Sequence, residues 1–580
     1  MANGMGGLYV GKSGLTGAQN AMNTTANNLT NVNTKGYVRE QVVYQDMTYS
    51  TLSKTRIDQR TNQSVNMQQM GLGVSIGDVV HSRDLFLDKY YRQEEGRQQF
   101  YEACQTTTNE LYELLQETEG EAFQDVIADM NEAIQELAKD PGSGVYQNLV
   151  VQKATLFVER SEALYNGIGE YQLNMNQQIT DTVDRVNKIG KSLVEINEQI
   201  RKVESGKMET AMQLRDERDL LLDELGQLGA ISYSENADGV VKVKFEGYEF
   251  VDEITCHPMA LRTDFVTKFV TPVWKETSNF AKEQYSDVFD FNTDISTELN
   301  TDIGKLKGLV MSRGTDVANF TQMFGVTAQE FNDTTGLSSL MTVQAQIDNL
   351  VRETVSKINN ILSPLKTQSI TVGGVTKTVQ VWDEDTGTVG LDGTGPGEEL
   401  FKRKGCDRYT TVVDDSGDTW YVYNDEDVNN SELLEGERDS STYYNILNLE
   451  VNPVLIDEPT KLPTFEQNGE VAHNMADKLK ATFSDKAVSV LPGGTLTSIL
   501  DYYDNMVGNQ ATIGDVFSGL SKTLESSVTS ISNQRQQVIG VSSDEELSNM
   551  IKYQSAYNAA SRYINTVDAM IEHLVVQLGS

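Results

Sequence analysis

Cysteine is scarce in this sequence of 580 residues, which contains only Cys104, Cys256 and Cys406. The three positions are widely separated and include no C-x-x-C pair. An odd, dispersed set excludes a disulfide framework and a zinc site of the usual ligand spacing. Proline is also rare, with nine residues. Because proline breaks a helix interior, its scarcity favours long uninterrupted helices.

Positive charge is in short supply as well. The chain has 85 acidic and 47 basic residues, for a net charge of −38. A surface of that sign repels nucleic acid and anionic membranes, so we predict neither as a partner. No apolar run reaches the ~18 residues that a membrane span needs. The first residues also lack the basic region and apolar core of a cleaved signal peptide. Composition alone therefore predicts a cytoplasmic chain.

Catalytic and metal-binding patterns are also lacking. The four histidines form no H-E-x-x-H pair, and no G-x-S-x-G elbow occurs. Gly6–Ser13 matches the P-loop pattern, but no buried strand leads into it, as a phosphate cradle requires. Acidic turns at 383–387, 414–418 and 425–429 lack EF-hand spacing. We interpret them as solvated turns, with weak calcium binding as the alternative. We predict no enzyme, no cofactor and no metal site.

A helical stripe near the C-terminus is the strongest pattern that the sequence does contain. Apolar side chains recur at alternating intervals of three and four residues, which is typical of a helix that supercoils against a partner helix. Ser543 and Glu546 have the S-x-x-E spacing of a capping box and predict where this helix begins. The predicted contact residues are Met550, Tyr553, Tyr557, Ala560, Ile564, Val567, Ile571 and Leu574.

A weaker stripe of the same period lies near the N-terminus. It consists of Leu8, Leu15, Met22 and Leu29, with Ala18 and Val32 at the companion offset, and an Asn- and Gly-rich stretch up to Gly36 ends the helix. Neither stripe has a partner next to it in the sequence. We therefore predict that the two helices pair and form the assembly interface; a short core helix is the alternative for the N-terminal stripe. Ordering a lone helix costs roughly 1–2 kcal/mol per residue, so both ends should be disordered until they are covered.

The middle of the chain alternates between helical and β-like patterns. Helical periodicity covers 84–140, 145–204, 208–226, 300–330, 343–363 and 510–539. Asn236–Gly239 marks a hairpin, and residues 366–445 are rich in β-branched and aromatic residues between Gly- and Asp-rich turns. These patterns predict a mainly α, elongated multidomain chain with paired terminal helices, a long helical bundle and an inserted β domain.

The same patterns divide the chain into five predicted segments. The outer two carry the paired helices, and the inner three form the body. They are a 1–80 axial helix and extended segment, an 81–365 helical bundle with a β-hairpin region at 230–270, a 366–445 β-rich outer insert, a 446–515 return to the helical domain, and a 516–580 axial coiled coil.

Both ends of the chain resemble a known family. Ser13–Gln19 and Asn27–Tyr37 are similar to the N-terminal signature shared by bacterial flagellar axial proteins, which are the rod, hook and hook-associated proteins. Further segments resemble the hook-associated protein 1 branch of that family, whereas 366–445 matches no motif. These segments are Gly73–Ile76, Arg83–Leu87, Leu214–Asp219, Gly304–Leu309, Gly540–Leu547 and Ile564–Asp568.

This resemblance implies a structural protein that assembles into a homo-oligomeric ring between hook and filament. It implies the hook protein and hook-associated protein 3 as neighbours, and a flagellar export chaperone at the C-terminus. It also implies type III export with unfolded ends and no cleaved signal peptide, which replaces the cytoplasmic prediction with an extracellular, flagellar one. The alternative is a surface-exposed adhesin or glycan-binding module carried by 366–445.

Overall fold

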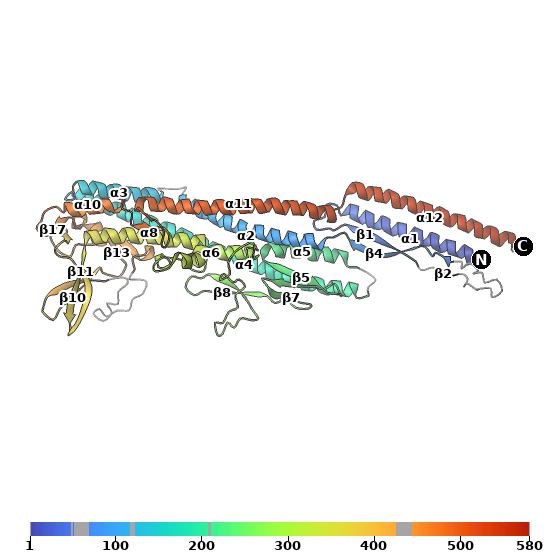
Figure 1. Cartoon of the computed structure of the whole chain (residues 1–580), viewed down its shortest axis with the longest axis horizontal. Helices are drawn as coiled ribbons and strands as arrows, with labels where there is room; N and C mark the ends of the chain where they lie inside the picture. The colour runs from blue at the N-terminus through green and yellow to red at the C-terminus, as the bar shows by residue number, and fades with distance from the viewer. Residues whose placement is uncertain are drawn as a thin grey trace, which may run out of the picture. The chain divides into compact units, whose positions relative to one another are not determined.

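The computed structural model describes residues 2–47, 50–51, 69–116, 122–206, 210–424 and 443–578. Of the described residues, 56% are helical, with long helices and several small sheets, so the predicted mainly α fold class with added β structure is confirmed (Figure 1). The helices are α1 (Ala2–Thr30), α2 (Leu85–Gln116), α3 (Phe123–Lys139), α4 (Gly144–Glu204), α5 (Met212–Leu228), α6 (Lys305–Arg313), α7 (Ala328–Asp333), α8 (Ser339–Leu362), α9 (Pro453–Asp457), α10 (His473–Thr482), α11 (Ile499–Ile539) and α12 (Ser543–Leu578).

The described strands pair antiparallel in small sheets. The larger sheets have the orders β5-β6-β7 and β10-β11-β15-β14, and the remaining strands pair as β1-β4, β2-β3, β8-β9, β12-β17, β13-β16 and β18-β19. The first group is β1 (Glu40–Asp46), β2 (Ser50–Thr51), β3 (Gln69–Met70), β4 (Val74–His81), β5 (Ile231–Glu235), β6 (Val241–Phe245), β7 (Tyr248–Val251), β8 (Met259–Thr263) and β9 (Val270–Trp274). The second group is β10 (Leu365–Val372), β11 (Val375–Trp382), β12 (Thr388–Val389), β13 (Phe401–Arg403), β14 (Tyr409–Val413), β15 (Thr419–Tyr423), β16 (Leu449–Val451), β17 (Phe465–Glu466), β18 (Val488–Ser489) and β19 (Leu496–Thr497).

Two compact units make up the chain, and both are discontinuous in sequence. Unit 1 comprises Met1–Gln98, Val186–Pro258 and Thr523–Ser580. Unit 2 comprises Gln99–Arg185 and Met259–Lys522. Three of the four boundaries fall within α2, α4 and α11, and the fourth lies directly before β8.

The core of unit 1 lies where α5 and the β5-β6-β7 sheet pack on α4. Ile196 and Ile200 of α4 belong to a buried cluster, against which the partly buried Leu214 and Leu221 of α5 pack. Asn197 holds the middle strand, because its Nδ2 donates to the Val241 carbonyl (2.8 Å) and its Oδ1 accepts from the Val241 amide (3.1 Å). Gly190 lets the sheet approach closely, since a Cβ there would lie 2.5 Å from the Phe250 ring. Helix α5 and this sheet are therefore fixed on one helical backbone.

Unit 2 has a core of its own around α8, whose residues Ile347, Leu350 and Val355 are completely buried. The four-stranded sheet adds a separate cluster of buried residues, which includes Val381 and Val422. Strands β11, β14 and β15 lie in the segment 366–445, where β structure is predicted from β-branched and aromatic residues.

Most predicted helices are confirmed, and the errors have local causes. The long helix expected at 145–204 is α4. Helix α11 begins at Ile499 rather than near 510, because Ser498 Oγ caps the amide of Asp501 at 3.1 Å. The expected helix at 300–330 is wrong over most of its length, since the positive φ of Gly314 (84°) ends α6. Among the described helices, none is long and apolar enough to cross a membrane.

Candidate assembly interface

The terminal helices α1 and α12 of unit 1 lie side by side and run antiparallel (Figure 1). Gly7, near the start of α1, faces Val567 near the end of α12. At the other end of the pair, Asn28 Nδ2 donates to a carboxylate oxygen of Glu546 at 3.3 Å. The two ends of the chain therefore pair along most of their helical length.

Small residues form the face of α1 that meets α12. They recur at alternating intervals of three and four, and Ala18 and Ala21 are 5% and 1% exposed. A Cβ added at Gly11 would lie 2.5 Å from Ile564 Cγ1, whereas a Cβ at Gly14 would lie 3.7 Å from its nearest neighbour, Ala560 Cβ. Because this face has almost no side-chain bulk, the backbones approach closely. The face consists of Gly7, Gly11, Gly14, Ala18, Ala21, Thr25 and Asn28.

The predicted stripe on α12 is the side of that helix that is shielded from solvent. Val567 is buried, and the other predicted positions with described side chains are partly buried: Met550, Tyr553, Tyr557, Ala560, Ile564 and Ile571. The side chain of Leu574 lies outside the described part of the chain. The structure therefore brings at least Ala560, Ile564 and Val567 against α1.

The four large residues of the predicted stripe on α1 lie one residue away from the contact face, whereas its companion residue Ala18 lies on that face. Leu8, Leu15, Met22 and Leu29 are partly exposed, and each follows a residue of the small-residue face. The sequence does contain the correct signal, as glycine and alanine at three- and four-residue intervals. A search for apolar residues passes over it, because glycine has no side chain to count. The partly exposed leucines remain available on the flank of the helix pair.

An ion pair fixes the base of the α1–α12 pair. The Glu546 side chain is 2% exposed and accepts from Arg39 Nη2 at 2.7 Å and Arg39 Nε at 2.8 Å. Asn28 joins the same cluster, because its Oδ1 accepts from the Tyr37 hydroxyl (2.8 Å) and the Glu40 amide (3.0 Å). This cluster ties the start of α12 to the end of α1 and the start of β1.

The predicted capping box at the start of α12 is wrong. The helix begins at Ser543, and the preceding residue, Ser542, accepts from the Glu545 amide through its side chain (3.5 Å) and from the Glu546 amide through its carbonyl (3.0 Å). Glu546 binds Arg39 instead of capping its own helix. The helix start follows from local sequence, whereas the role of Glu546 depends on a residue about 500 positions away.

Helix α5 supports the segment that follows α1. The Val38 amide donates to Asp216 Oδ2 at 3.2 Å, and His81 Nε2 lies 3.4 Å from Asp216 Oδ1. Burial raises the pKa of Asp216 to about 7 and lowers the pKa of His81 to about 4. Burial also raises the pKa of Glu40. This site therefore disfavours charge on its ionisable groups, as expected of a structural contact that is shielded from water.

Alternating arginines and aspartates join α2, α5 and α11 in unit 1. Arg92 Nε donates to Asp223 Oδ1 at 2.6 Å, and Arg535 bridges Asp88 (2.6 Å) and Asp223 (2.7 Å). Arg83 bonds Asp88 at 2.7 Å and also pairs with Asp219. The Arg/Asp-rich sequence of α5 therefore has a structural role, because it links segments that are far apart in the chain.

The P-loop interpretation of Gly6–Ser13 is excluded by the backbone. These residues lie inside α1, where Ser13 Oγ donates to the Val10 carbonyl at 2.9 Å. A helix interior has no free amides to cradle a phosphate, since each amide bonds the preceding turn. The motif is a chance match.

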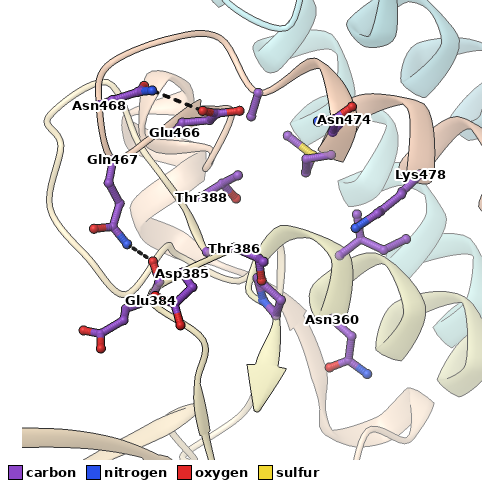
Figure 2. A pocket seen from close by; sticks show the side chains of 15 residues that line it. Asn360, Glu384, Asp385, Thr386, Thr388, Glu466, Gln467, Asn468, Asn474 and Lys478 are labelled. Carbon is purple, nitrogen blue, oxygen red and sulfur yellow. Dashed lines mark hydrogen bonds between the residues drawn. The ribbon is translucent and has the colours of Figure 1, made fainter.

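A polar pocket of about 580 Å³ occurs in unit 2, between β12, β17, α8 and α10 (Figure 2). Gln467 donates to the Glu384 carbonyl, and Asn468 Nδ2 donates to Glu466 Oε2 at 3.3 Å. The described lining has no histidine or cysteine, so it offers neither a catalytic imidazole nor a thiolate. These polar side chains largely bond to neighbouring protein groups.

The carboxylates of the acidic turns are also used in hydrogen bonds within the protein. Asp414 accepts from the amides of Ser416 and Asp418, both at 2.9 Å, and from the Trp420 indole at 3.0 Å. The turn at 425–429 lies outside the described residues. In the described part of the chain, no group of three or more His, Cys, Asp and Glu is placed to hold a metal ion.

Family models match three parts of the chain. Residues 108–336 match the flagellar hook-associated protein FlgK helical domain. Residues 8–37 match the flagella basal body rod protein model, and residues 531–578 match the C-terminal model of the flagellar basal body rod FlgEFG proteins. The two rod-protein matches fall on the paired helices.

Relatives match over nearly the full length. The chain is 25% identical over 579 residues to flagellar hook-associated protein 1 of Bacillus subtilis, covering 99% of this chain and 98% of that one. It is 22% identical to the protein of the same name from Escherichia coli, covering 97% and 98%. The solved flagellar hook junction protein FlgK from Burkholderia pseudomallei shares the fold, with a TM-score of 0.52 and 12% identity over 78% of this chain and all of that one.

Proposed function

We propose that this chain, a member of the flagellar hook-associated protein 1 family, is a structural junction protein that connects the hook to the filament of a bacterial flagellum. One observation carries the proposal. The FlgK helical-domain match lies between terminal segments that match rod proteins, in a chain that aligns with hook-associated protein 1 from end to end. Rod and hook proteins share the terminal segments, so the middle match distinguishes the junction protein.

The paired helices are the proposed assembly interface of the ring. In a single copy, α12 covers only one of its faces with α1, and large apolar side chains on its other faces stay exposed, such as Ile551 (66%), Met570 (61%) and Val575 (59%). Burial of such side chains against neighbouring copies contributes roughly 1.5–3 kcal/mol each. Copies of the chain packed around a common axis would supply that cover.

A comparison of the burial energy with the entropy cost of ordering supports export with disordered ends. Ordering the backbone of two long helices costs roughly 1–2 kcal/mol per residue. The contact between α1 and α12 buries only one face of each helix and offsets only part of that entropy cost. The two helices should therefore become fully ordered when neighbouring copies cover them. We propose that the ends pass unfolded through the type III export apparatus, without a cleaved signal peptide. The chain then functions outside the cell.

The proposed partners are further copies of this chain in a ring, the hook protein and hook-associated protein 3, with an export chaperone that binds the C-terminus before assembly. The net charge of −38 disfavours nucleic acid and anionic membranes as partners. The adhesin alternative is not supported, since the matched families and relatives are flagellar axial proteins.

A deletion strain tests the proposed function. Cells that lack this chain should have intact hooks without attached filaments and should release filament protein into the medium. Production of the full chain should restore filaments, as electron microscopy of single cells would show. Normal filaments on the deletion strain would contradict the proposal.

Two glycine substitutions test the small-residue face. In both substitutions alanine replaces glycine, which stabilises the helix by up to about 1 kcal/mol because alanine has the higher helix propensity. Gly11→Ala also places a Cβ 2.5 Å from Ile564, whose branched side chain has little freedom to move, whereas Gly14→Ala makes only ordinary contact at 3.7 Å. Overpacking costs about 1–3 kcal/mol. We therefore expect Gly11→Ala cells to lose filaments under mild shear and Gly14→Ala cells to retain them. Equal retention would contradict close packing at Gly11.

A further inference from the structure

Two buried polar atoms of unit 1 face each other at the contact between Val38, His81 and Asp216, which we call the α5 joint. His81 is the last residue of β4, and its Nε2 lies 3.4 Å from Oδ1 of Asp216 in α5. The two side chains are 9% and 12% exposed, and neither atom has a hydrogen bond in the described structure. A buried polar atom without a hydrogen bond is costly, so these two atoms have each other as bonding partners.

A single hydrogen between the two atoms bonds them to each other. With no hydrogen two lone pairs repel, and with a hydrogen on each atom two donors clash. The hydrogen belongs either to Nε2, which leaves a carboxylate on Asp216, or to Oδ1, which leaves a carboxylic acid beside a ring whose own hydrogen is on Nδ1. The charges around the pair decide between these arrangements.

Burial favours the carboxylic acid on Asp216. It is the largest effect on this side chain and raises the pKa of Asp216 to about 7. Glu40 faces the site from β1 and adds to the rise, whereas the Val38 amide and the Arg83 guanidinium oppose it. The other titratable groups on this side of the joint are Tyr37, whose pKa burial raises, and Glu546 of α12, which acts on Tyr37.

The cations that face the pair disfavour a charged ring on His81. Burial lowers the pKa of His81 to about 4, and the positive charges of Arg83 and Arg215 act in the same direction. Both guanidiniums are already held by other carboxylates, so neither depends on Asp216 for a counter-charge. These bonds run from Arg83 to Asp88 (2.7 Å) and Asp219, and from Arg215 to Glu204 (2.8 Å) and Glu235 (2.7 Å).

Unfolding places the proton on the other side chain. In water the pKa of histidine is about 6.5 and that of aspartic acid about 3.9, so the imidazole holds the proton and the carboxyl is ionised. Because folding raises the pKa of Asp216, this group favours the folded state at low pH and loses that effect as the pH rises to about 7. Because folding lowers the pKa of His81, this group favours the folded state at higher pH and loses that effect as the pH falls to about 4. Between about pH 4 and 6.5 the two effects cancel, since each state holds one proton.

We propose that folding of unit 1 moves one proton from the His81 imidazolium to the Asp216 carboxylate and thereby makes the α5 joint insensitive to pH in acidic to neutral media. An N–H bond of the ring is broken and an O–H bond of the carboxyl is formed, so a positive and a negative charge disappear together and the solvent exchanges no proton. Two neutral groups are then buried, which avoids the cost of burying two ions. A chain that functions outside the cell meets media of varying pH, and this joint keeps its stability in them. The pair acts in this way with or without the proposed ring.

Nitrogen NMR of the full chain, labelled with ¹⁵N in its histidines, tests where the proton lies. The chain has four histidines, and the spectrum of the His81→Phe variant identifies the signals of His81 by their loss. At about pH 5.5, where a histidine in water is mostly charged, the His81 ring should be neutral with its hydrogen on Nδ1. An imidazolium spectrum of His81 at that pH would overturn the proposal.

Two substitutions should unbalance the pair in opposite directions. Asp216→Asn supplies an amide that can donate to Nε2, so the variant should fold, but His81 then titrates alone. The opening constant of α5 in this variant, divided by that of the natural chain, should fall by up to about tenfold per pH unit between about pH 4.5 and 6.5. In His81→Phe the same ratio should rise by up to about tenfold per pH unit, because Asp216 titrates alone.

Amide hydrogen exchange of α5, corrected for the intrinsic pH dependence of exchange, provides the opening constants. Division by the value for the natural chain removes the contributions of other groups, such as Glu40. The double variant His81→Phe/Asp216→Asn is the matched control; it has neither group, so its ratio should be the same at every pH in this range. A pH-independent ratio in either single variant, or a pH-dependent one in the double variant, would show that the two groups do not compensate each other.

Discussion

Ile564→Asp is expected to abolish filament attachment and swimming. Ile564 lies against Gly11 in the closest part of the α1–α12 pair. A carboxylate there must either lose its hydration or push the helices apart, and burial of an unpaired charge is among the costliest substitutions. Ile571, which is partly buried on the same stripe, should give the same result with aspartate. Soft-agar swimming and electron microscopy of complemented deletion cells provide the measurement.

Asn565→Asp is the matched control for Ile564→Asp. Residue 565 follows Ile564 directly, is exposed and accepts the same new charge without burial. Cells with this variant should swim normally. The folding of unit 2 should be unchanged in both variants, as judged by amide hydrogen exchange of α8. Normal swimming of the Ile564→Asp strain would show that the stripe is not an assembly interface.

Arg535→Met is expected to destabilise unit 1 more than any surface change. Arg535 is 12% exposed at its side chain and pairs with Asp88 and Asp223, whose side chains are 2% and 16% exposed. Removing one partner of a buried ion pair costs about 3–5 kcal/mol, because the other charge stays buried. We expect about 3 kcal/mol, since Arg83 still pairs with Asp88 and Arg92 with Asp223.

Amide hydrogen exchange of α5 provides the measurement for Arg535→Met. A loss of that size should speed the exchange about 100-fold, at tenfold per 1.4 kcal/mol. Lys202→Met is the control, because the Lys202–Glu198 pair is exposed and screened by solvent, so its loss should leave the exchange rate nearly unchanged. Equal exchange rates in the two variants would show that the buried network adds nothing to the stability of unit 1.

Local patterns in the sequence were sufficient for most of the helices and for the family. The α12 stripe was visible because apolar side chains repeat with the helical period, and α4 because nothing within it breaks that period. Ser498 shows the limit of this approach, because it begins α11 with a serine–aspartate cap that is visible in the sequence but easily overlooked. Element types were therefore easier to predict than element ends.

Partners far apart in the chain were decided only by the tertiary structure. Arg535 and Asp223 are 312 positions apart, and no periodicity relates them. Glu546 has the spacing of a cap, yet it binds Arg39 because α12 folds back on the start of the chain. Charged residues at suitable spacing have many possible partners, and only the folded backbone selects among them.

The terminal helices show both contributions together. The sequence by itself determined that both ends are helical, that α12 has one apolar stripe, and that the two helices lack local partners. The tertiary structure decided that α1 meets α12 through glycine and alanine rather than through its leucines. Periodicity reports where bulky side chains lie on a single helix. The closest approach of two helices is set by the positions where side chains are smallest, and that depends on both helices at once.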